Sequence, residues 1–156
     1  MWLIVVVPLA VLSLRGSRWA YGGFVLFAIA FLPARAGFEI QSLVCETPVS
    51  VASGLYSLQN WKHILLCTVV SLMTLAQFRE RSPSAFVVAM LATVSLGFVA
   101  ELEQGFFRDG HCRMRDLVPD AAGAMLGASL GLVWSRRQAN NQMQRTSAAQ
   151  ALNARR

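Results

Sequence analysis

The sequence predicts an all-α fold, a small polytopic bundle of four to five transmembrane helices, and two observations lead to this prediction. Hydrophobic residues make up 55% of the 156 residues and charged residues only 14%, which is outside the usual range of soluble domains. Long apolar runs then recur along the chain, at residues 2–14, 19–34, 63–78, 84–100 and 118–134. Flanking residues extend most of them toward the ~20 residues that cross a bilayer, and none alternates like a barrel strand, so each is expected to be a helix.

The first run, at residues 2–14, is the shortest and contains Pro8. Arg15 and Arg18 follow it and no positive charge precedes it, which is the reverse of the charge order in a signal peptide. We therefore expect residues 1–18 to form a short, uncleaved hydrophobic helix with its N-terminus outside. A mis-assigned start codon upstream of the real first helix is the alternative, and whether this run spans the membrane stays open.

Lys and Arg residues predict the orientation of the helices, because they are enriched on the cytoplasmic side. Five helices with an outside N-terminus leave the loops 35–62 and 101–117 outside the cytoplasm. Nine of the fourteen Lys and Arg residues are then cytoplasmic and five are not. The nine are Arg15, Arg18, Arg79, Arg81, Arg136, Arg137, Arg145, Arg155 and Arg156, and the five are Arg35, Lys62, Arg108, Arg113 and Arg115.

The polar tail at 136–156 is expected to be a cytoplasmic extension that is disordered or loosely helical. The net charge of +6 comes largely from this tail, and no nucleic-acid-binding motif accompanies it. The expected partner is therefore the lipid bilayer and not nucleic acid. The sequence does not indicate an oligomeric state.

The segment ELEQGFFRDGHCRMRDLVPD, residues 101–120, gathers polar residues between two predicted helices. At about 100° per residue, Glu101 and Gln104 share a face of the first helix. Glycines spaced by four let another helix approach closely, and the preceding helix at 84–100 is the expected partner. On the second helix, at 118–134 and its N-terminal flank, one face carries a stripe made of Asp116, Asp120, Gly123, Gly127 and Gly131. The acids and the glutamine would then meet at the extracytoplasmic ends of the two helices.

The motif E-x-x-Q at 101–104 is followed by an arginine-containing polar loop and by D-x-x-x-D-x-x-G at 116–123, and Lys62 and His63 open an earlier helix. This combination resembles the VanZ-like family of bacterial integral membrane proteins, in which the second motif begins with Asp, then Asn, then Gly. The resemblance implies a VanZ-like transmembrane domain of about four helices at residues 19–135. Asp120 departs from the family pattern, because it stands where the family has Asn.

The resemblance implies a multi-pass protein of the bacterial inner (cytoplasmic) membrane, and the distribution of Lys and Arg predicts that its C-terminus lies in the cytoplasm. The resemblance also implies a link to glycopeptide antibiotic resistance, but no reaction, because the activity of the family is unsettled. We expect the acidic cluster to bind a polar envelope component, such as a lipid-linked precursor. One alternative is a membrane-embedded enzyme that acts on such a precursor, and another is a structural cluster that only ties helix ends together. No catalytic residue is assigned.

The candidate ligand-binding side chains share polar character and the predicted outer face. The arginine forks among them suit phosphate or carboxylate groups. The histidine is either a donor into the cluster or an interface anchor beside Trp61 and Lys62. The candidates are Glu101, Gln104, Arg108, Arg113, Arg115, Asp116, Asp120 and His63.

Cysteines and possible metal ligands add two further expectations. Cys45 and Cys112 fall in the two outer loops, where an oxidising compartment allows them to form a disulfide. A metal site could be assembled from Glu101, His111, Cys112 and Asp116, but no metal-ligand spacing supports it. We therefore expect no metal and no other cofactor.

Overall fold

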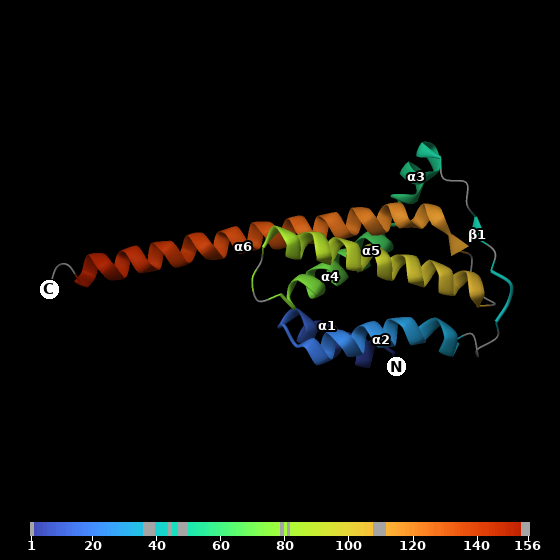
Figure 1. The fold of residues 1–156 in the computed structure, drawn as a ribbon, viewed down its shortest axis with the longest axis horizontal. Helices are drawn as coiled ribbons and strands as arrows, with labels where there is room; N and C mark the ends of the chain where they lie inside the picture. The colour runs from blue at the N-terminus through green and yellow to red at the C-terminus, as the bar shows by residue number, and fades with distance from the viewer. Residues whose placement is uncertain are drawn as a thin grey trace.

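The computed structural model describes residues 2–35, 40–43, 45–46, 50–78, 80, 82–107 and 112–153, and it confirms the all-α fold. Five helices match the five apolar runs to within a few residues at most of their ends, apart from the C-terminal helix. In the described part they are α1 (Trp2–Leu14), α2 (Arg18–Arg35), α4 (Trp61–Leu75), α5 (Pro83–Phe106) and α6 (Leu117–Asn153), as Figure 1 shows. A short helix α3 (Val51–Ser57), a 3-10 turn η1 (Met114–Asp116) and two strands, β1 (Cys45–Glu46) and β2 (Cys112–Arg113), lie between them.

Two tight connections lie at the same end of the bundle. Gly16 links α1 to α2 with a φ of 87°, a backbone conformation that residues other than glycine rarely adopt. Gln77 follows α4 and its Nε2 donates to the Ser13 carbonyl oxygen at 2.9 Å, which ties this connection to the end of α1. Ser82 caps α5 by accepting from the Ala85 N–H, and Pro83 takes the first helical position, where its missing N–H costs nothing.

The glycine stripe of α6 packs against α4, so the predicted partner, the helix at 84–100, is wrong. A Cβ atom at Gly123 would collide with the Ile64 carbonyl oxygen, and one at Gly127 would lie 2.6 Å from the Thr68 carbonyl oxygen. One at Gly131 would lie 2.7 Å from a Leu75 methyl carbon. The helix that is adjacent in sequence is therefore not the one that packs against the glycine stripe.

The facing side of α4 explains its choice as the partner. It carries small and hydroxyl side chains that fit against a backbone and bond to it. Thr68 Oγ1 donates to the Gly123 carbonyl oxygen at 3.1 Å, and Ser71 Oγ donates to the Ala124 carbonyl oxygen at 3.0 Å. The same pattern of glycines with interhelical hydroxyl bonds holds helices together in lipid.

The opposite end of the bundle joins the two long loops. Cys45 and Cys112 form a disulfide, and β1 pairs with β2 in parallel, with Glu46 opposite Arg113. The sequence left this disulfide open, and the structure forms it. The described parts of the loops at 35–62 and 101–117 therefore meet at one end, which is the right-hand end in Figure 1.

The helix α3 was not predicted, because the whole of 35–62 was interpreted as a loop. Ser50 and Ser53 form a reciprocal capping box at its start, with the Ser50 Oγ accepting from the Ser53 N–H at 3.1 Å. Ser57 near its end donates to the Arg115 carbonyl oxygen at 2.9 Å. The short helix thereby rests on the segment that leads into α6.

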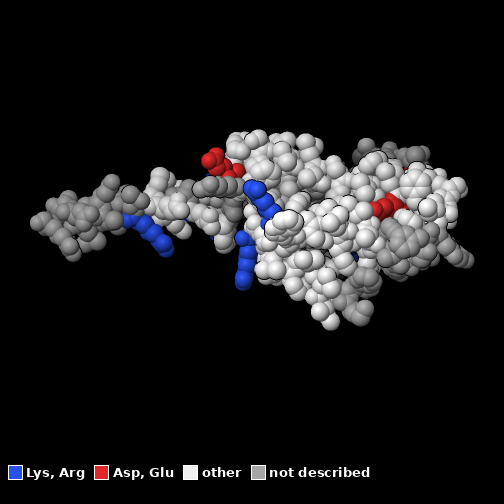
Figure 2. Space-filling model, turned by 60° about the horizontal axis from the view of Figure 1, so that its bottom comes forward, with Lys and Arg blue, Asp and Glu red and all other residues white. Residues whose placement is uncertain are grey.

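Among the described residues, two helices are long and apolar enough to cross a membrane, Pro83–Phe106 and Met114–Arg145. Three further apolar helices, Ile4–Leu14, Arg18–Phe31 and Trp61–Leu75, are shorter. On the face drawn in Figure 2 the described surface carries few charged side chains, and the Lys and Arg side chains seen there lie mainly where α6 projects from the bundle.

The tail was expected to be disordered or loosely helical, and in the structure α6 continues through it to Asn153. Ala, Gln and Arg dominate this part of the chain, and all three have good helix propensity. The tail leaves the bundle as a single extended helix (Figure 1).

Candidate ligand-binding site

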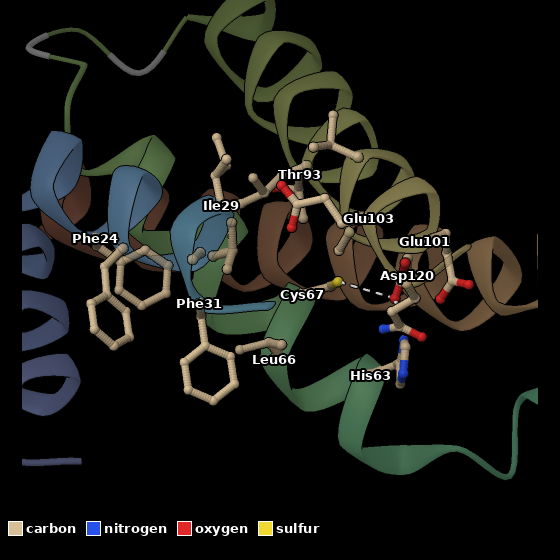
Figure 3. Close-up of a pocket in the computed structure, with 18 of the residues that line it drawn as sticks. Phe24, Ile29, Phe31, His63, Leu66, Cys67, Thr93, Glu101, Glu103 and Asp120 are labelled. Atoms are coloured by element: carbon tan, nitrogen blue, oxygen red, sulfur yellow. Dashed lines mark hydrogen bonds and ion pairs between the residues drawn. The ribbon is translucent and has the colours of Figure 1, made fainter. Parts of the chain in front are cut away.

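A pocket of about 400 Å³ opens between α2, α4, α5 and the first turn of α6. Most of its lining is apolar and includes Phe24 and Phe31 from α2 and Leu66 from α4. Figure 3 shows these side chains on one side and His63, Glu101 and Asp120 on the other. The pocket therefore has an apolar body and a polar end.

Asp120 is the centre of the polar end. It is only 2% exposed, and its Oδ1 lies 2.9 Å from His63 Nδ1. The thiol of Cys67, one helical turn from His63, donates to the same oxygen at 3.3 Å (Figure 3). Histidine and cysteine at i and i+4 on α4 thus both face the carboxylate from α6.

The carboxylate fits because α5 presents a glycine there. A Cβ atom at Gly97 would collide with Asp120 Oδ2, so any larger residue at this position would displace the acid. Neither Gly97 nor Cys67 was predicted from the sequence as a site residue. The only signal for Gly97 was a glycine in the interior of a helix, which is a common sign of a close approach.

Glu101 is held from the opposite side. It is 1% exposed, and its Oε2 accepts a hydrogen bond of 2.9 Å from the backbone N–H of Arg113. Arg113 belongs to β2, which the disulfide and β1 fix in place. The covalent link between the loops therefore determines where the buried glutamate is held.

The structure brings together most of the candidate residues. Donor atoms of His63, Glu101 and Asp116 lie within 4.8 Å of one another. Gln104 and Glu103 line the pocket next to Glu101. Glu103 was not among the candidates predicted from the sequence, so the polar end is more acidic than the sequence suggested.

The arginines differ from the expectation that they complete the ligand pocket. Arg113 Nε lies 3.9 Å from Glu46 Oε2, and Arg115 Nη2 lies 3.8 Å from the same oxygen. Neither arginine is among the described residues that line the pocket. Arg108 and His111 lie outside the described residues.

The reason for this difference is the strand pairing. It sets Glu46 opposite Arg113, and Glu46 was not predicted from the sequence as a partner of the arginines. These two ion pairs are partly exposed and therefore stabilise the loops only weakly.

A comparison with protein-family models, with curated proteins and with solved structures found no match for this chain.

Proposed function

We propose that this chain is a VanZ-like, multi-pass protein of the bacterial inner membrane that binds an amphiphilic component of the cell envelope in the pocket. The apolar chain of the ligand lies among the phenylalanines of α2, and its polar head lies at Glu101 and Asp120. The resemblance in the motifs at 101–104 and 116–123 supports the family assignment and the expected link to glycopeptide resistance.

Exposed apolar side chains support a multi-pass arrangement. Trp19 is 93% exposed, Ile4 74% and Leu26 69%, and large exposed apolar residues occur on every one of the five apolar helices. Each such side chain would cost about 1.5–3 kcal/mol in water relative to burial, whereas lipid tails are as apolar as the side chains themselves. A surface of this kind is stable only when something apolar covers it.

The ends of the helices support the proposed orientation. The disulfide between Cys45 and Cys112 fits an oxidising compartment outside the cytoplasm. Arg136 lies about 30 Å along α6 from Leu117, close to the thickness of the hydrocarbon core. Arg15 and Arg18 lie at the connection of α1 to α2, at the end away from the disulfide.

The single observation that carries the proposed function is the composition of the pocket. Its apolar walls suit an acyl or isoprenoid chain, and its end holds two buried carboxyl groups and a histidine. A purely structural cluster that ties helix ends together needs no cavity beside it. The carboxylates accept hydrogen bonds, so the hydroxyl or amine groups of a saccharide or peptide head suit them directly.

The test is to identify the amphiphiles that copurify with the protein from bacterial membranes by lipid mass spectrometry. Ala28 lines the pocket from α2, and Ala28→Phe fills it. Ala30 lies two residues further on α2, is exposed and is not among the described lining residues, so Ala30→Phe is the matched control.

We expect one class of envelope amphiphile to be enriched on the wild type and on Ala30→Phe, and to be lost from Ala28→Phe. If all three proteins copurify with the same mixture of bulk phospholipids, the proposal is contradicted. The alternative of a cluster that only ties helix ends together would then be favoured. Conversion of the bound compound by the wild type would favour the enzyme alternative.

A further inference from the structure

We propose that His63, Glu101 and Asp116 form a binding site for a divalent transition metal ion of the zinc class. The three side chains come from α4, α5 and η1, and their donor atoms lie within 4.8 Å of one another. This site does not depend on which molecule occupies the pocket. It replaces the set of ligands considered from the sequence, in which Cys112 is no longer a thiol because it forms the disulfide.

The types of donor suit such an ion. Imidazole nitrogen and carboxylate oxygen are both donors that zinc accepts, and a site with three protein ligands leaves a fourth position open. Donor atoms around a tetrahedral zinc ion lie about 3.4 Å apart, given bonds of about 2.1 Å. The side chains must therefore close by up to about 1.4 Å, which a small rotation of the half-buried Asp116 side chain would supply.

Two of the three proposed ligands are held by a further partner. Asp120 engages Nδ1 of His63 at 2.9 Å, which fixes the orientation of the ring and would leave Nε2 as the ligand atom. The Arg113 N–H holds Glu101 Oε2 at 2.9 Å. A histidine bonded to a carboxylate, beside a carboxylate that is itself hydrogen-bonded, is the usual surrounding of a metal centre.

The balance of charge also favours a bound cation. Glu101, Asp116 and Asp120 bring three carboxyl groups to one place, two of them almost fully buried. No Lys or Arg is among the described residues that line the adjoining pocket, and Arg113 and Arg115 lie against Glu46. Buried acids are costly unless they are paired or coordinate a metal, and a divalent ion would neutralise two of the three.

The position of the site gives the ion a role. His63, Glu101 and Asp120 line the polar end of the pocket, so the open coordination position would face a ligand held there. A metal ion at this end would accept a phosphate or carboxylate oxygen, which the carboxylates alone would repel. Acidic residues and an anionic head group are thereby compatible in one site.

The experiment is a titration with Zn²⁺ of the purified, tag-free, full-length protein in detergent. Isothermal titration calorimetry measures the binding. Co²⁺ serves as a second probe, because its visible absorption reports nitrogen and oxygen ligands in a tetrahedral site. We expect one Zn²⁺ per chain, and loss of this binding in His63→Gln, Glu101→Gln and Asp116→Asn. Asp120→Asn should weaken binding roughly 10- to 100-fold, because it releases the histidine ring.

Glu103→Gln is the matched control, since Glu103 lines the same pocket outside the proposed ligand set. It should bind Zn²⁺ as the wild type does. The helical content and elution of each variant are measured before metal is added, and Asp116→Asn is the least disruptive because Asp116 is only half-buried. Absence of a one-to-one complex in the wild type, or an equal loss in Glu103→Gln and Asp116→Asn, would overturn the proposal.

Discussion

The two sides of α4 show opposite ways of packing a helix. Against α6, glycines and hydroxyl side chains bring the two backbones into contact, and Gly127 has room for no side chain. Toward α2, bulky side chains such as Phe24 and Leu66 stand around a cavity of about 400 Å³. The close contact fixes the position of Asp120 and His63, and the loose side leaves space for a ligand beside them.

The largest expected effect comes from the disulfide that joins the two loops at the polar end of the bundle. Cys45→Ser with Cys112→Ser should lower the free energy of unfolding by about 4 kcal/mol, because the disulfide closes a separation of 67 residues in the unfolded chain. Thermal unfolding in detergent measures the change. An equal stability of both proteins under oxidising conditions would show that the link does not form in the folded protein.

Closing the space between α4 and α6 should have the next largest effect. Gly127→Leu should cost about 3 kcal/mol, because the Thr68 carbonyl oxygen lies 2.6 Å from the new Cβ and cannot move without its helix. Gly22→Leu on α2 is the control, since nothing lies within 4 Å of a Cβ there. Equal melting temperatures for the two variants would contradict the distinction between the two sides.

A smaller loss is expected from a single hydroxyl in the same interface. Ser71 is fully buried and donates to the Ala124 carbonyl oxygen, so Ser71→Ala should cost about 0.6 kcal/mol. Ser129→Ala, at an exposed position of α6, should leave the unfolding curve unchanged. A larger loss at Ser129 than at Ser71 would show that the interface is placed on the wrong face.

The smallest change in stability is expected on the loose side. Ala28→Phe fills existing space in the pocket, so the free energy of unfolding should change by no more than about 1 kcal/mol. The same variant is expected to lose the copurifying amphiphile. A loss of stability as large as that of Gly127→Leu would indicate that no real cavity exists there.

The helices themselves were predictable from the sequence, because apolar run length is a strong signal for long helices. α3 was missed because a helix of seven residues leaves no periodic pattern, and its cap has Ser53 where a capping box usually has Glu or Gln. The partner of the glycine stripe was wrong because a small-residue groove shows where a helix packs but not which one.

The polar residues of the site were also predictable as a group, since acids and a histidine at the edge of apolar helices are unusual. Their individual contacts were not. The bond from Cys67 to Asp120 and the fit of Asp120 on Gly97 depend on how three helices meet. Arg113 and Arg115 form ion pairs with Glu46 because two short strands pair and bring these side chains together. No sequence signal indicated this strand pairing.

The most direct test of the proposed binding is photo-crosslinking in intact membranes from two positions on α2. A benzoylphenylalanine in place of Phe31 would lie in the pocket, and one in place of Leu26, which is 69% exposed and not among the described lining residues, would face outward. We predict a single class of envelope amphiphile attached at position 31 and mixed bulk phospholipid at position 26. The same bulk phospholipid at both positions would contradict the account.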